Sequence, residues 1–328
     1  MELEAKLVAM LALVTGGTGF VGSYLVDELL ASGWNVRCTV RSTSKLRWLE
    51  GKKVESVRAD LNDPASLSGV GKGADIVFNV AGVLRGDTYA DYRKGNVETT
   101  QNVLDATARV RRFVYVSSIT ACGPALNGQP LTEDLPCAPV SLYGRSKAEA
   151  EAAVKSSRTG GATIVRPPVV YGPRDEGMLD LYRTLARGMR PEIGGPKFTS
   201  LVHVRDLARG LVLAGGDMGI GKTFFLSNRE PVSFKELANL ILRGMKKRAL
   251  RVPIPDRVVR LLGELAEGYT KMTGRGGLFS RDKAIEMTQK SWVCSPALAK
   301  RLLDWEAKIS PEEGFKETLE WYKVEKLV

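Results

Sequence analysis

The sequence predicts an α/β fold with a doubly wound parallel sheet. Two observations carry this prediction: short apolar runs alternate with helical patterns through the first half of the chain, and the first run ends in a glycine-rich turn. The chain has 328 residues, which allows one such domain and a smaller C-terminal lobe. We expect the sheet domain over residues 1–170. The lobe is expected mainly over residues 171–328, with some of its segments returning to the first domain.

Composition narrows the class of protein. Hydrophobic residues make up 44% and charged residues 26% of the chain, as in globular proteins, and no apolar run reaches the length of a membrane span. The net charge of +11 is spread along the chain, which permits a phosphate-bearing ligand or an anionic membrane surface but predicts no nucleic-acid partner. The four cysteines and the single His203 lack metal-ligand spacing, so no metal site is expected. The charged start, residues 1–7, lacks the order of a secretory signal, and we expect a cytoplasmic protein.

The first βαβ unit begins with the apolar run at residues 10–15. A turn with a glycine at every third position follows, and then a helical pattern over 23–31 and a strand pattern over 34–41. The glycines are Gly16, Gly19 and Gly22. A tight turn that opens a helix lets a diphosphate approach the backbone at the helix N-terminus. This unit therefore predicts a dinucleotide site.

The end of the second strand distinguishes the two nicotinamide cofactors. NAD-binding proteins usually place an acidic residue there, but here Arg41 and Ser42 follow the strand and no carboxylate comes before Glu50. A guanidinium can pair with a 2′-phosphate, and Ser42 and Lys45 add donors. The sequence favours NADP(H) over NAD(H).

The alternation then continues. Strand patterns cover residues 54–59, 74–82 and 112–118, a helix is predicted over 96–107, and Asp63 is placed to cap a short helix. Polar and glycine residues follow these strands at the edge where a ligand would bind. They are Gly16, Arg41, Asp60, Gly82 and Ser118.

A candidate catalytic group comes next. Residues 141–154 read as a helix on which Tyr143 and Lys147 are one turn apart, after a strand that ends in serines. A nearby ammonium favours the phenolate, so we expect Lys147 to lower the pKa of Tyr143 and make it a usable acid or base.

Seven motifs in order along the chain carry a family resemblance: residues 15–22, 60–61, 80–82, 116–123, 143–147, 166–173 and 201–206. The chain resembles the extended short-chain dehydrogenase/reductase family, or NAD(P)-dependent epimerase/dehydratase superfamily, which has a Rossmann sheet. It is most similar to the branch of 3β-hydroxysteroid dehydrogenases and dihydroflavonol reductases. The resemblance implies an NAD(P)-dependent enzyme that is expected to be a homodimer.

The resemblance also implies roles for single residues. Ser118 would hold the substrate oxygen, Tyr143 would pass the proton, and Lys147 would hold the nicotinamide ribose, whereas His203 falls in a structural element. The implied cofactor contacts are Thr15, Gly16, Gly19, Phe20, Val21, Gly22, Arg41, Ser42, Lys45, Asp60, Leu61, Val80, Ala81, Gly82, Asn96, Tyr143, Lys147, Pro167 and Val169.

The substrate class is predicted from two positions at which this sequence differs from the usual pattern of the family. Sugar-nucleotide enzymes of this family usually bind the substrate diphosphate with an asparagine and an arginine, at positions where this chain has Val169 and Thr199. An apolar ketone or hydroxysteroid-like substrate is therefore favoured. The alternatives are an NAD-dependent sugar-nucleotide epimerase or dehydratase and a non-enzymatic cofactor sensor. Residues 252–271 could cover the pocket or lie against a membrane surface.

Overall fold

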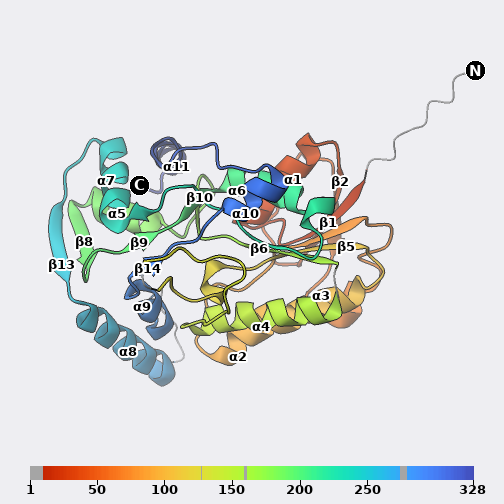
Figure 1. Ribbon diagram of the computed structural model, residues 1–328, viewed down its shortest axis with the longest axis horizontal. Coiled ribbons are helices and arrows are strands. Elements are labelled where there is room, and N and C mark those ends of the chain that lie inside the picture. Colours follow the sequence, from red (N-terminus) through yellow and green to blue (C-terminus); the bar gives the residue numbers. More distant parts are fainter. Residues whose placement is uncertain (1–9, 127, 159–160, 274–278) are drawn as a thin grey trace, which may run out of the picture.

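A seven-stranded parallel sheet forms the centre of the computed structural model, which describes residues 10–126, 128–158, 161–273 and 279–328 (Figure 1). The sheet order is β11-β6-β5-β4-β1-β2-β3, and the order reverses direction between β1 and β4. The strands are β1 (Leu11–Thr15), β2 (Asn35–Val40), β3 (Val54–Arg58), β4 (Ile76–Asn79), β5 (Arg112–Val116), β6 (Ala162–Arg166) and β11 (Thr223–Phe225). The predicted doubly wound α/β fold is confirmed, and ligands bind such sheets where the order reverses.

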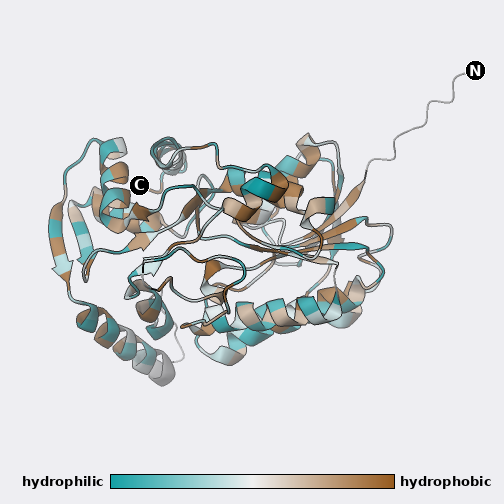
Figure 2. Cartoon of the chain, in the orientation of Figure 1, coloured by the Kyte–Doolittle hydropathy of each residue, from teal (hydrophilic) through white to brown (hydrophobic). Residues whose placement is uncertain are grey.

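Helices cover both faces of this sheet. One face packs against α1 (Phe20–Ala31), α6 (Val204–Ala214) and α10 (Ala297–Leu303), and the other against α3 (Thr99–Ala106) and α4 (Leu142–Ser157). The central strands are therefore continuous apolar runs, with every residue of β4 and of β6 buried. Figure 2 shows the hydrophobic colours gathered on these strands.

Two segments expected as helices contain helical turns of other types, which hydrophobic periodicity cannot tell from an α-helix. The helix predicted over 96–107 is a π-helical turn, η2 (Arg93–Glu98), continued by α3, and α2 (Tyr89–Tyr92) precedes it. Asp63 caps its helix as expected by accepting from Ala65 N, but η1 (Pro64–Leu67) is a 3₁₀ turn. The other two 3₁₀ turns among the described residues are η3 (Ile119–Ala121) and η4 (Asp217–Gly219).

The second half of the chain adds a smaller lobe with its own apolar core. Aromatic and aliphatic side chains from several of its segments fill that core, including the fully buried Tyr171, Tyr182 and Tyr322. Its strands are β7 (Val169–Tyr171), β8 (Met189–Ile193), β9 (Phe198–Thr199), β10 (Leu201–His203), β12 (Val232–Ser233), β13 (Leu250–Ile254) and β14 (Ser291–Trp292). Its helices are α5 (Leu179–Ala186), α7 (Phe234–Met245), α8 (Asp256–Thr273), α9 (Arg281–Met287) and α11 (Pro311–Val324). β11, α6 and α10 also follow residue 170 in the sequence, yet they pack in the sheet domain.

The structure bears on the expected lack of a membrane span, but not on the start of the chain. No helix in the described part of the chain is long and apolar enough to cross a bilayer. Residues 1–9, which include the charged start considered above, lie outside the described residues.

Candidate active site

The glycine turn between β1 and α1 is packed too closely for side chains. Gly16 has a φ of +72°, and a Cβ on it would lie 2.8 Å from Ala81 N. A Cβ on Gly22 would lie 2.1 Å from Gly16 O, and Gly19 N donates to the same oxygen at 3.0 Å. The turn therefore needs glycine at these positions, and it brings α1 directly against the end of β1.

The N-terminus of α1 fits an anionic group. Its N-cap is Gly19, which supplies no side-chain oxygen, and its first turn contains no acidic residue. The first backbone N–H groups thus keep their hydrogen-bonding capacity, and the helix dipole favours negative charge at this point. A diphosphate supplies both the acceptors and the charge.

The end of β4 is fixed beside this turn. The Thr15 hydroxyl donates to Asn79 Oδ1 at 2.6 Å and accepts from Ala81 N at 3.2 Å. Both side chains are nearly fully buried. This pairing brings residues 80–82, which were predicted as cofactor contacts, against the glycine turn.

Asn96 ties the same edge to the helix that carries the candidate catalytic residues. Its Oδ1 accepts from Val83 N at 2.7 Å, and its Nδ2 donates to Ser146 Oγ at 2.9 Å. A Cβ on Gly82 would lie 3.0 Å from Asn96 Oδ1 and 3.8 Å from Lys147 Nζ. The structure thus places Asn96 and Gly82 beside Lys147.

The residues expected around the adenosine part of the cofactor lie at the open edge of the sheet. Arg41, Ser42 and Lys45 are exposed after β2, and Arg41 N donates to Ser44 Oγ at 2.9 Å. Asp60 follows the neighbouring β3. Hydrogen bonds from Asn62 lower the pKa of Asp60, with a smaller contribution from the charge of Arg41. A basic and an acidic side chain therefore follow neighbouring strands at this edge.

Ser118 and Tyr143 are brought together at the end of β5. Ser118 caps η3, where its Oγ accepts from Thr120 N at 3.2 Å, and it lies close enough to Tyr143 to lower the pKa of the phenol. Ser117 points elsewhere: it is buried and donates to Glu151 Oε1 at 2.6 Å. Of the two adjacent serines, Ser118 is therefore the one beside the tyrosine.

Lys147 lies one turn further along α4, and its ammonium group points to the end of β5. Its Nζ donates to Val116 O at 2.7 Å and lies 4.4 Å from the centre of the Tyr115 ring. Burial lowers the pKa of Lys147 to about 7. Burial, followed by the negative charge of Glu286, raises the pKa of Tyr143. The pKa of Tyr143 is therefore raised in this structure and not lowered as expected, because desolvation of the phenol is the largest influence on it.

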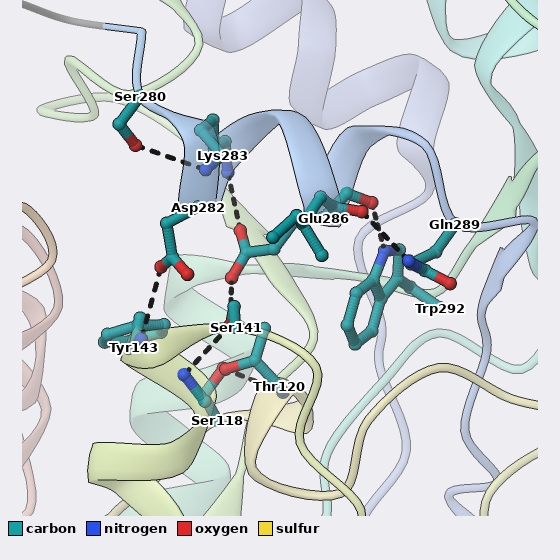
Figure 3. A network of polar contacts seen from close by, with 12 residues as sticks. Ser118, Thr120, Ser141, Tyr143, Ser280, Asp282, Lys283, Glu286, Gln289 and Trp292 are labelled. Carbon is teal, nitrogen blue, oxygen red and sulfur yellow. Dashed lines mark hydrogen bonds and ion pairs between the residues drawn. The ribbon is translucent and has the colours of Figure 1, made fainter. Parts of the chain in front are cut away.

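The lobe contributes two carboxylates that sequence reasoning missed (Figure 3). Asp282, on α9, accepts from Leu142 N at 2.5 Å and from Tyr143 N at 3.2 Å. Glu286, one turn later, accepts from Ser141 Oγ at 2.8 Å. Together they hold the N-terminus of α4, where Tyr143 lies. The sequence offers only a weak signal for them, two acids four residues apart on a short helix.

The remaining predicted residues lie at the junction of the two lobes. Pro167 O accepts from Ile119 N at 2.9 Å, which places this proline against the turn that follows Ser118. Val169, on β7, is half-buried and pairs with Leu201 on β10. Thr199 is buried and donates to Ser200 O at 3.1 Å.

His203 has a structural position. It is fully buried at the N-cap of α6, and its Nδ1 accepts from Arg205 N at 3.3 Å. Burial and the charge of Arg205 lower its pKa to about 4, so the imidazole is neutral near neutral pH. Among the described residues, no group of His, Cys, Asp and Glu could hold a metal ion.

The sequence was compared with protein families and with known proteins. The model of the NAD-dependent epimerase/dehydratase family matches residues 12–224, which include the glycine turn, Ser118, Tyr143 and Lys147. A ceramide reductase of Caulobacter vibrioides is 29% identical over 315 residues, covering 94% of this chain and 93% of that protein. A decarboxylating sterol-4-alpha-carboxylate 3-dehydrogenase of Dictyostelium discoideum is 26% identical over 330 residues, covering 93% and 98%.

Solved structures give the same fold. The crystal structure of gox2253 matches with a TM-score of 0.82 at 26% identity, covering 97% of this chain and 99% of that one. A UDP-glucose 4-epimerase of Thermotoga maritima matches with a TM-score of 0.80 at 22% identity, covering 97% and 100%. The second likeness concerns the fold alone.

Proposed function

The chain belongs to the NAD-dependent epimerase/dehydratase family, and from this premise we propose that it is an NADP(H)-dependent oxidoreductase for the carbonyl or secondary alcohol of an apolar substrate. The observation that carries the proposal is the placement of Ser118 beside Tyr143, with Lys147 one turn away from the tyrosine on the same helix. These groups lie beyond the carboxyl end of β5, next to the glycine turn region, where a doubly wound sheet binds its ligand.

The cofactor proposal rests on the fit of the residues present. The α1 N-terminus and the close-packed glycine turn suit the diphosphate, and exposed Arg41 stands where NAD-binding proteins usually have an acid. Ser42 and Lys45, also exposed, add donors for a 2′-phosphate. When bound, the nicotinamide supplies or accepts the hydride.

The proton step falls to Tyr143. Because burial raises its pKa, the phenol stays protonated near neutral pH, and it can donate to the oxygen of a carbonyl substrate as that carbonyl is reduced. Ser118, which lies beside the same phenol, would hold the substrate oxygen. Lys147 and Asn96 would hold the nicotinamide ribose and the surrounding loops.

The substrate proposal rests on the side chains of Val169 and Thr199. Val169 is apolar, and the Thr199 hydroxyl is turned to its neighbouring carbonyl, so neither side chain supplies a cation for a diphosphate. An ionised group is not buried without partners. Relatives named for ceramide, for a farnesyl quinoline oxide and for sterols support an apolar substrate. We assign cofactor binding to residues 1–170 and substrate binding mainly to 171–328.

Calorimetric titration distinguishes this proposal from the alternative of a sugar-nucleotide enzyme. That alternative is considered because the chain shares its fold with a UDP-glucose 4-epimerase. The protein loaded with NADPH is titrated with a 3-ketosteroid and, separately, with UDP-glucose. We expect micromolar binding of the ketone alone. Binding of UDP-glucose without binding of the ketone would favour the alternative.

A further inference from the structure

Two cysteines lie together directly behind the catalytic turn. Cys122 and Cys137 are free thiols whose Sγ atoms are 3.8 Å apart. Cys122 is buried and ends η3, the turn that Ser118 begins. Cys137 is exposed on the loop that leads to α4, and Ala138 N donates to Cys122 O at 2.9 Å. The pair thus joins a buried thiol to one that solvent reaches.

A buried cation contacts the exposed thiol. Arg166 Nη2 lies 3.1 Å from Cys137 Sγ and 2.6 Å from Glu151 Oε2, and Arg166 Nε donates to Glu151 Oε1 at 2.9 Å. The guanidinium side chain is only 2% exposed. A fixed guanidinium beside a thiol stabilises its thiolate, which is the nucleophilic form.

The four thiols of the chain differ in the direction in which their pKa values are shifted. A hydrogen bond from Cys122, helped by the charge of Arg166, lowers the pKa of Cys137 to about 7. The same hydrogen bond, together with burial, raises the pKa of Cys122. Burial raises the pKa of Cys38 and of Cys294 to about 12. Of the four thiols, Cys137 is the one whose pKa is lowered.

We propose that Cys137 is a peroxide-reactive thiolate and Cys122 its resolving thiol, so that the two form a reversible disulfide site beside the catalytic serine. The Cys137 thiolate attacks one oxygen of hydrogen peroxide, the O–O bond breaks, and a sulfenic acid and hydroxide result. Cys122 sulfur then attacks the sulfenic sulfur, the S–O bond breaks, and the departing hydroxide takes the Cys122 proton as water. The thiols lose two electrons and the peroxide gains them.

The two sulfurs must approach each other for the disulfide to form. The Sγ separation must shorten from 3.8 Å to about 2.05 Å for a disulfide. Cys137 lies in the stretch between Leu131 and α4, which contains neither helix nor strand. Cys122 is held by η3, so the movement falls on the Cys137 side.

Mass spectrometry of the intact protein treated with hydrogen peroxide tests the proposal. We expect the wild type to lose two hydrogen atoms and to yield a peptide that links Cys122 to Cys137, with reversal by a dithiol reductant. Cys122→Ser should instead retain a sulfenic acid on Cys137, which a 1,3-diketone reagent traps. Cys294→Ser is the matched control, and it should form the same linked peptide as the wild type.

A second measurement uses alkylation. Cys137 should react with iodoacetamide at neutral pH many-fold faster than Cys294, in the wild type and in Cys122→Ser. Equal rates for the two cysteines, or peroxide-treated wild type without the linked peptide, would overturn the proposal. Both readouts report thiol chemistry, so they stand or fall independently of the oxidoreductase reaction.

Discussion

Replacing Asp282 by alanine should loosen the helix that carries Tyr143, the proposed proton donor. Asp282 is 9% exposed, and its carboxylate accepts from the first two N–H groups of α4, Leu142 N and Tyr143 N. Without it these two donors lose their partner, while the third, Gly144 N, keeps the Ser141 hydroxyl at 3.0 Å. The variant therefore weakens both the docking of α9 and the first turn of α4.

The size of the effect follows from these contacts. A hydrogen bond to a charged group contributes about 1.5–3 kcal/mol, and a carboxylate at a helix N-terminus about 0.3–1 kcal/mol. Burial raises the pKa of Asp282, so desolvation offsets part of this gain. We expect the free energy of unfolding to fall by about 2–3 kcal/mol rather than by the full sum. Turnover should fall roughly tenfold or more, because a misplaced proton donor slows the chemical step.

Urea unfolding and steady-state kinetics check this expectation. Lys283→Ala is the matched control, since Lys283 is an exposed neighbour on α9 whose side chain contacts Glu286 rather than a backbone N–H of α4. Asp282→Asn keeps one oxygen acceptor without the charge and should fall between the two. If Asp282→Ala unfolded at the same urea concentration as Lys283→Ala and kept its turnover, the proposed docking role would be refuted.

Three further predictions concern the proposed catalytic and cofactor residues. Tyr143→Phe should lower turnover by about 10²–10⁴-fold with the NADPH dissociation constant nearly unchanged, measured by fluorescence titration; retained turnover would assign proton transfer to another group. The pKa of Lys147 in the folded protein is about 7, below its ordinary value. Between about pH 7 and about pH 10 the unfolded chain therefore binds more protons than the folded protein. Over this range the free energy of unfolding should rise with pH, by up to about 1.4 kcal/mol per pH unit from Lys147. Lys147→Met should lack this rise in urea unfolding, and an equal pH slope in both proteins would contradict it. Arg41→Asp should weaken NADPH binding about 10- to 100-fold relative to NADH, and an unchanged ratio of the two dissociation constants would count against Arg41 as a 2′-phosphate contact.

The fold could be predicted because its signals are local. Strands buried on both faces appear as continuous apolar runs, and the turn at Gly16 needs glycine for a positive φ and a close approach to Ala81. The lobe gives weaker signals, since β9, β12 and β14 have two residues each. The π-helical turn at 93–98 retains a helical pattern, so periodicity could not distinguish it from α-helix.

The site was only partly predictable because part of it is assembled from distant segments. Ser118, Tyr143 and Lys147 have recognisable spacing, whereas Asp282 lies 139 residues from the Tyr143 N–H that it binds. Cys122 and Cys137 have no metal-ligand or redox spacing, and only the fold brings their sulfurs to 3.8 Å. The first contact depends on how the lobe packs against α4, and the second on how the loop before α4 folds back onto η3. No local sequence pattern records either arrangement.

The protonation state of Tyr143 bears on the direction in which the site works best. An oxidation needs the phenolate to take a proton from the alcohol, and burial together with Glu286 disfavours that second negative charge. A reduction needs a neutral phenol beside an oxygen that becomes negative as hydride arrives, and the same burial preserves the neutral phenol. The ammonium group of Lys147 is held by Val116 O through a buried 2.7 Å hydrogen bond. These groups therefore favour the neutral phenol near neutral pH, which is the form that the proposed carbonyl reduction requires.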